Sequence, residues 1–198
     1  MLVLFIGDMH CGSRDGIADE DSGQLTARNR PLLRAWLEME RAASKEKSLI
    51  LMLGGDLVDG VQHHGAITWG NRKEQRECAI RLITPLADRA TRIFSLLGTE
   101  AHAAQDGEED ETVGESLGAE AVGHQHLLEI GGQLIDWAHH GINVSIDPRN
   151  EDNGLIMTAK RVEELALRNG ARVPDLVVSH HAHRAPMPVT VRGITVAV

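Results

Sequence analysis

Aspartate and histidine side chains gather in five short clusters along the chain, and each cluster follows a run of apolar residues. Carboxylate and imidazole ligands without paired cysteines are unlike a structural zinc site and are typical of catalytic Mn, Fe or Zn. Histidine also exchanges protons readily near neutral pH. These residue types therefore predict metal-assisted catalysis. The clusters are Asp8-x-His10, Asp56-x-x-Asp59, Gly98-Thr99-Glu100-Ala101-His102, His139-His140 and His181-x-His183.

The number and order of the clusters matter more than any one of them. A lone buried histidine is usually a core residue, and an aspartate at a strand end is often part of a turn or a helix cap. Five clusters in succession favour one shared metal centre over five separate structural roles. Where the backbone is extended, the Asp-x-His and His-x-His spacings place both side chains on one side. Each pair could then supply two ligands to one centre.

The stretch from 49 to 60 shows how the chain would deliver these side chains. Residues 49–53 are a continuous apolar run, which is typical of a strand buried on both faces. Gly54 and Gly55 allow a sharp turn at the end of that strand, and Asp56 and Asp59 follow. Open α/β sheets bind their ligands at the carboxyl ends of strands. The pattern therefore predicts two carboxylates at a sheet edge.

The remaining apolar runs predict the elements around this strand. Strands are expected at 2–6, 91–97, 126–130, 133–138 and 175–179, with a final hairpin at 189–198. Gly131-Gly132 predicts a tight hairpin turn. Helices are expected at 25–43, 71–90 and 153–169, with a short one near 108–117 that begins with acidic residues. Pro31 either starts the first helix or kinks it. The order of elements predicts an α/β fold, a sandwich of sheets and helices.

Composition limits the possible functions. A chain of 198 residues with 42% hydrophobic and 25% charged residues is expected to form one soluble domain, 1–198. The net charge of −9 argues against a broad basic surface for nucleic acid or anionic lipid, although scattered arginines such as Arg72, Arg76 and Arg81 could share a helix face. No segment is long and apolar enough to predict a membrane span. Two cysteines without an export signal predict a cytoplasmic protein.

The five clusters resemble the motifs of the calcineurin-like metallophosphoesterases. Those motifs are D-x-H, G-D-x-x-D, G-N-H-[DE], a lone H and G-H-x-H, each at a strand end. The resemblance runs from Asp8 to His183 in the same order and so covers nearly the whole chain. It implies two mixed β-sheets flanked by helices in a four-layer arrangement. The chain stops on an apolar run at 194–198, which leaves open that a final segment is missing.

The resemblance also implies a set of metal ligands. Two divalent ions are expected, with Mn²⁺ favoured and Fe, Zn, Ni or Co as alternatives. Asp56 would bridge the two ions, and Asp59 would orient a ligand from behind. Because the lone histidine of the family is often followed by glycine, His140 is favoured over His139. The first ion would be held by Asp8, His10, Asp56 and His183, and the second by Asp56, His139 or His140, and His181.

The third motif departs from the family pattern. Thr99 stands where the family has its asparagine ligand, so either Thr99 is a poorer ligand or Glu100 replaces the asparagine oxygen. His102 is then the best candidate for the catalytic histidine, displaced by two residues. The GTEAH sequence resembles a variant in phage-encoded members of the family, which suggests a phage or prophage origin and a host-cytoplasmic location.

Three functions remain open from the sequence. The first is a metal-dependent phosphoester hydrolase, more a phosphodiesterase than a monoesterase, that uses a bridging hydroxide between two ions and His102 as the acid. The second is a nuclease of the same family, which the net charge does not favour. The third is a non-catalytic protein that binds a metal or a partner and has a degenerate second site. The identity of the phosphoester substrate and the oligomeric state are left open.

Overall fold

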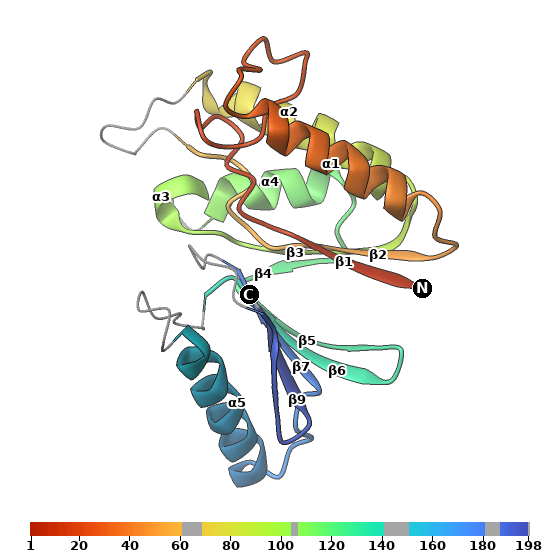
Figure 1. Cartoon of the computed structure of the whole chain (residues 1–198), viewed down its shortest axis with the longest axis vertical. Helices are drawn as coiled ribbons and strands as arrows, with labels where there is room; N and C mark the ends of the chain where they lie inside the picture. The colour runs from red at the N-terminus through yellow and green to blue at the C-terminus, as the bar shows by residue number, and fades with distance from the viewer. Residues whose placement is uncertain (61–68, 104–106, 141–150, 181–186, 198) are drawn as a thin grey trace. The chain divides into compact units, whose positions relative to one another are not determined.

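The computed structural model describes residues 1–60, 69–103, 107–140, 151–180 and 187–197 (Figure 1). The chain divides into two compact units, Met1–Gly123 and His124–Val198. The single domain and the four-layer stacking expected from the sequence remain predictions. None of the described helices has the length and hydropathy that are needed to cross a membrane.

A four-stranded parallel sheet forms the centre of the first unit. Its strands are β1 (Leu2–Ile6), β2 (Leu49–Leu53), β3 (Ala90–Leu96) and β4 (Ala121–Gly123), in the order β1-β2-β3-β4. All three pairings are parallel. The resemblance implies a mixed sheet, and that expectation is wrong for this unit. All five residues of β2 are buried, as expected for the central strand of a parallel sheet.

Four helices lie within the described part of the first unit, and Figure 1 shows three of them, α1, α2 and α4, on the same face of the sheet. Pro31 lies in the first turn of α1, so it starts this helix and does not kink it. Asn71 and Glu74 form a reciprocal capping box at the start of α2. The helices are α1 (Arg30–Ala43), α2 (Arg72–Ala87), α3 (Glu100–Ala103) and α4 (Glu108–Ser116).

The described residues of the second unit form a mixed five-stranded sheet and one helix. Its strands are β5 (Gln125–Ile130), β6 (Gln133–Ala138), β7 (Leu176–Ser179), β8 (Val189–Val191) and β9 (Ile194–Ala197), in the order β5-β6-β7-β9-β8. Gly131 and Gly132 both have positive φ in the β5–β6 turn, which confirms the predicted hairpin. The helix α5 (Glu151–Arg168) packs against β8 and β9 around Leu155 and Val196. The predicted α/β fold with two sheets flanked by helices is confirmed.

Candidate metal centre

The segments after β1 and β2 run side by side beyond the ends of their strands. The N–H groups of Asp8 and His10 donate to the carbonyl oxygens of Gly55 and Asp56, each at 3.0 Å. Asp8, His10 and Asp56 all have positive φ, between 46° and 51°, a conformation that is costly for non-glycine residues. The backbone at Asp8-x-His10 is therefore not extended, so the condition under which the Asp-x-His spacing would place both side chains on one side is not met here. Local strain of this kind often marks functional sites.

Three side chains of the first unit converge on one point. His10, Asp56 and His102 each offer a ligand atom, and these atoms all lie within 4.8 Å of one another. Asp56 is fully buried and His102 is nearly so. Asp8 adds a carboxylate oxygen 4.0 Å from Nε2 of His10. Two imidazoles and two carboxylates in this arrangement are a donor set that fits a divalent cation.

Asp59 holds both imidazoles from behind. Its Oδ1 lies 3.5 Å from Nδ1 of His10 and 3.5 Å from Nδ1 of His102, and the two rings meet edge to face with centroids 4.3 Å apart. Burial alone would raise the pKa of Asp59, but the two imidazoles 3.5 Å from its carboxylate lower it to about 2. Asp59 is therefore a charged group beside two candidate ligands, and the role predicted for it, to orient a metal ligand, remains a prediction.

The third motif places Thr99 directly on the Asp56 carboxylate. The N–H of Thr99 donates to Oδ1 of Asp56 at 2.7 Å, and its hydroxyl donates to the same atom at 3.1 Å. Glu100 is exposed and belongs to none of the candidate metal groups among the described residues. That either Thr99 or Glu100 supplies a metal ligand remains a prediction. What the structure shows is that Thr99 orients Asp56.

One buried carboxylate next to these residues is absent from the sequence-based set. Asp110, the third residue of α4, is fully buried and accepts three backbone N–H groups from the loops that carry Asp56 and Thr99. Burial is the main reason that the pKa of Asp110 rises to about 7, and the charge of Asp56 adds to the effect, while the three N–H groups oppose it. From the sequence, the acidic run at 108–111 is sufficiently explained as the start of a helix.

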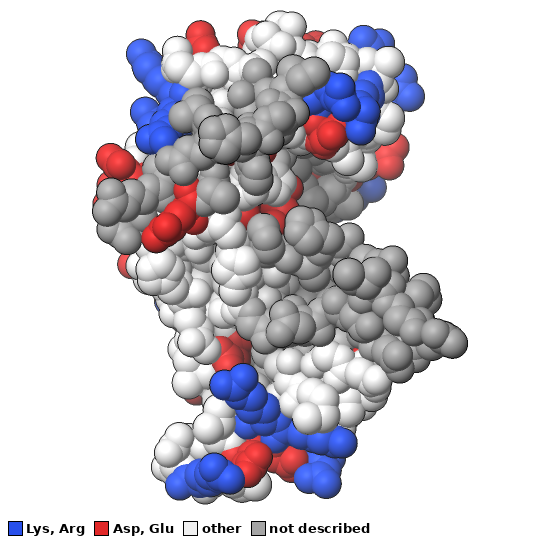
Figure 2. Space-filling view, turned by 90° about the vertical axis from the view of Figure 1, so that its left-hand side faces the viewer, with Lys and Arg blue, Asp and Glu red and all other residues white. Residues whose placement is uncertain are grey.

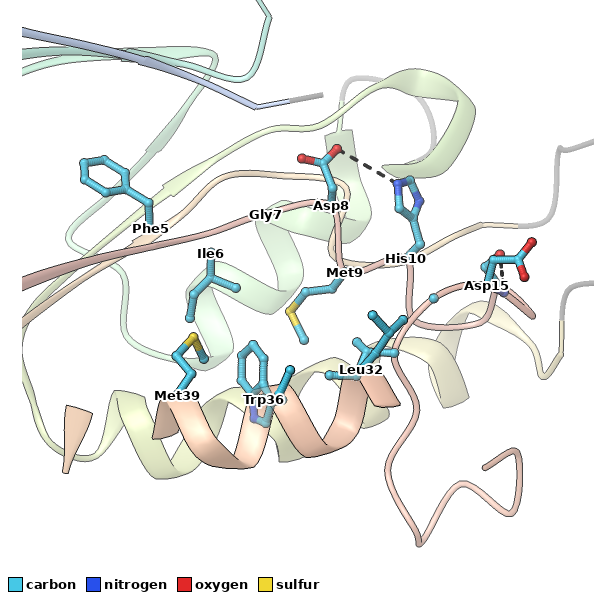
Figure 3. Close-up of a pocket in the computed structure, with 14 residues that line it drawn as sticks. Phe5, Ile6, Gly7, Asp8, Met9, His10, Asp15, Leu32, Trp36 and Met39 are labelled. Carbon is cyan, nitrogen blue, oxygen red and sulfur yellow. Dashed lines mark hydrogen bonds and ion pairs between the residues drawn. The ribbon is translucent and has the colours of Figure 1, made fainter. Parts of the chain in front are cut away.

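Apolar residues support the Asp8–His10 loop from the side opposite to its ligands. Figure 3 shows Met9 directed toward Trp36 and Met39 of α1, whereas the Asp8 and His10 side chains point to the other side of the loop. Between the loop and α1 lies a pocket of about 530 Å³. This packing fixes which side of the loop presents its polar groups.

The second unit holds the remaining histidines of the predicted ligand set. His139, directly after β6, is buried, and its carbonyl oxygen accepts from Oγ of Ser179 at 3.1 Å. His140 is exposed and lines a groove of about 600 Å³ beside α5. The choice of His140 over His139 remains a prediction. His180 accepts from the indole N–H of Trp137 at 3.0 Å, and His181 and His183 lie outside the described residues.

Comparison with known proteins identifies the fold. No protein-family model and no curated protein matches the sequence. A solved structure described as a novel archaeal phosphodiesterase aligns with all of this chain and 82% of its own, at 12% identity and a TM-score of 0.52. Two further structures align at lower TM-scores. A protein of unknown function from Aquifex aeolicus gives 0.43, with 14% identity over 92% of this chain and 79% of its own. Zinc-bound Vps29 from Entamoeba histolytica gives 0.44, with 13% identity over 100% and 72%.

The fold is therefore metallophosphoesterase-like, and the resemblance that the five motifs indicate is confirmed at this level. The His10, Asp56 and His102 group, which could bind a metal, agrees with that class.

Proposed function

We propose that this protein is a metal-dependent phosphohydrolase that cleaves phosphodiesters. The observation that carries this proposal is the convergence of His10, Asp56 and His102, with Asp59 behind both imidazoles. The archaeal phosphodiesterase with the same fold supports the preference for a diester by analogy.

Two divalent ions would be the cofactor, with Mn²⁺ favoured over Fe, Zn, Ni or Co. Asp8, His10 and Asp56 would hold them from the first unit. His139 or His140, His181 and His183 are the ligands proposed from the second. When bound, the ions would neutralise phosphate oxygens and make a coordinated water acidic. A cytoplasmic location also remains a prediction.

Asp56 and His102 of the first unit would have different roles in the reaction. Asp56 is held in one orientation by Thr99 and is the carboxylate suited to bridge the ions. Nδ1 of His102 faces the carboxylate and the carbonyl oxygen of Asp59, and its Nε2 would donate a proton to the leaving oxygen. Burial lowers the pKa of His102, but the hydrogen bond with Asp59 and the charge of Asp56 outweigh it, so the pKa is raised. This shift favours the protonated form of His102.

Hydrolysis of bis-p-nitrophenyl phosphate with Mn²⁺ tests the proposal. We expect Asp56→Asn to abolish turnover, and His102→Gln to lower kcat by about 10²- to 10⁴-fold. Two exposed residues provide matched controls, Asp88→Asn and His124→Gln, which should leave kcat unchanged. No turnover in the wild-type protein, or turnover that survives Asp56→Asn, would refute the hydrolase.

The nuclease alternative loses its main support. Arg72 and Arg76 both pair with the buried carboxylate of Glu109, and Arg81 forms two hydrogen bonds with Asp19. On the face that Figure 2 shows, acidic side chains lie next to the basic ones of the described residues. A phosphate backbone is bound by a continuous basic track.

A non-catalytic role keeps one argument in its favour. The Thr99 hydroxyl donates to Asp56, so it is engaged where the family has an asparagine ligand. The second ion is therefore expected to bind more weakly than the first. Calorimetry that finds one tight ion, together with no hydrolysis of any phosphoester, would favour the non-catalytic protein.

A further inference from the structure

A single buried carboxylate, that of Asp110, contacts the backbone of two separate loops at the candidate metal centre. Its Oδ2 accepts the N–H of Asp56 at 2.9 Å and the N–H of Gly98 at 2.8 Å. Its Oδ1 accepts the N–H of Leu57 at 3.0 Å. Asp56 and Leu57 follow β2, and Gly98 follows β3. The carboxylate therefore ties together the ends of two neighbouring strands.

The joined backbone groups are those that set the direction of the Asp56 side chain. Asp56 has a φ of 50°, a conformation that persists only when its surroundings enforce it. Thr99 follows Gly98 directly and makes two hydrogen bonds to Oδ1 of Asp56. Asp110 thus holds the Asp56 backbone on one side and, through Gly98, the residue that orients its carboxylate on the other.

Close packing shows that the loops have little freedom around this contact. A Cβ atom at Gly98 would lie 2.2 Å from Oδ1 of Asp56 and 2.5 Å from Oδ2 of Asp110. The neighbouring residue of α4, Glu109, is equally buried but faces Arg72 and Arg76. The acidic run therefore contains one carboxylate that pairs with arginines and one that accepts loop N–H groups.

Burial of a carboxylate beside a second carboxylate is costly, and it is tolerated where several N–H groups compensate. An asparagine at 110 would offer only one acceptor oxygen for these three donors. We propose that Asp110 is a positioning residue of the metal centre, which holds the loops of Asp56 and Thr99 in the geometry that binds the cation. This inference rests on the metal centre of the proposed function and adds a residue that none of the five motifs contains.

The test compares Asp110→Asn with Glu109→Gln. Both changes alter an adjacent, buried carboxylate on α4, but Glu109 holds none of the loop N–H groups. We expect Asp110→Asn to weaken Mn²⁺ binding, measured by calorimetry without substrate, by about 10- to 100-fold, as for other residues that orient ligands. At saturating Mn²⁺, kcat should recover toward the wild-type value. Glu109→Gln should change Mn²⁺ affinity by less than about twofold, even if it lowers the melting temperature.

A second measurement needs neither a variant nor the metal. In metal-free wild-type protein, NMR should detect couplings across the hydrogen bonds from the amide nitrogens of Asp56, Leu57 and Gly98 to the carboxyl carbon of Asp110. Those amide protons should also exchange slowly with solvent. Absence of the couplings, or Mn²⁺ affinity in Asp110→Asn within twofold of wild type, would overturn the inference. If the wild-type protein binds Mn²⁺ but hydrolyses no phosphodiester, the proposed function fails and the role of Asp110 stands.

Discussion

The two units of the molecule use polar side chains in different ways. Eight of the ten buried polar or charged residues among those described belong to the first unit, and several of them hold loop backbone or candidate ligands. Gln75, for example, bonds to both the N–H and the carbonyl oxygen of Gly60. In the second unit only His139 and Ser179 are buried polar residues among those described. In the first unit, buried polar side chains therefore hold loop backbone in place.

The second unit shows the opposite balance at its surface. Of the eight large apolar side chains that are exposed among the described residues, five lie in this shorter unit: Leu127, Met157, Leu165, Leu167 and Met187. Its ion pairs, such as Arg168 with Glu164 and Arg192 with Glu163, have at least one largely exposed partner. We therefore expect the same type of substitution to lower the free energy of unfolding much more in the first unit than in the second.

Two glycines offer the strongest contrast. In Gly98→Ala the new Cβ would lie 2.4 Å from the backbone nitrogen of Asp56, which cannot move aside without breaking the Asp110 contacts. We expect a loss of about 3 kcal/mol or more in the free energy of unfolding, at the upper end for overpacked sites. Gly132→Ala meets no atom within 4 Å, so only the strain of its positive φ remains, at about 1 kcal/mol. Urea unfolding of both variants measures the difference, and equal losses would contradict the contrast.

The sequence predicts the polar strand ends well because that signal is local. An apolar run, a glycine and then an aspartate occupy adjacent positions, and the structure confirms the strands after which Asp8, Asp56 and His102 follow. The sequence does not reveal Asp110, because its partners Asp56 and Leu57 lie more than 50 residues away along the chain. Within the acidic run, nothing local separates buried Asp110 from exposed Glu111.

Other features depend on the fold rather than on composition. The strand β4 has three residues, too few to show a periodicity. The positive φ of Asp8 and His10 arises where two loops pair after their strands end, and the Asp-x-His spacing alone does not reveal this conformation. His139 and His140 are adjacent and chemically identical, and only the structure distinguishes the buried one from the exposed one.

Two arginine substitutions, one in each unit, test the same contrast by removing a charge. Arg76→Met would weaken the pairing of Glu109, which is only 3% exposed, leaving Arg72 at 3.8 Å as its remaining partner. We expect a loss of about 2–3 kcal/mol in the free energy of unfolding, because a buried charge would be left poorly compensated. Arg168→Met in the second unit removes an exposed pair with Glu164 and should cost less than about 0.5 kcal/mol.

Salt separates these two cases further. The effect of Arg76→Met should be nearly unchanged between low and high ionic strength, since a buried pair is poorly screened. Any effect of Arg168→Met should disappear in high salt. If both variants lose the same stability, or if salt removes the Arg76 effect, the distinction between the interiors of the two units is wrong.

The pH dependence of stability gives the smallest expected difference. Asp19 in the first unit accepts two hydrogen bonds from Arg81, at 2.6 and 3.1 Å. Burial raises the pKa of Asp19, but the hydrogen bonds from Arg81 and from the N–H of Ser22 outweigh it, so the pKa is lowered below its ordinary value of 3.8. Since the folded state releases this proton more readily, Asp19 contributes stability above about pH 4 and loses it as the pH falls through the folded-state pKa.

Asp19→Asn should therefore destabilise the protein by about 1 kcal/mol at pH 6, and the difference from wild type should shrink as the pH falls from 5 to 3. Asp175 in the second unit accepts from the N–H of Leu134 and from Arg172, and its pKa is lowered for these reasons, but it is well exposed. Asp175→Asn should follow the same direction with a smaller amplitude that salt reduces.

Urea unfolding of the metal-free protein across this pH range provides the measurement. A constant difference between Asp19→Asn and wild type would mean that the Arg81 contact does not depend on the charge of Asp19, because protonation of that carboxyl would then leave stability unaffected.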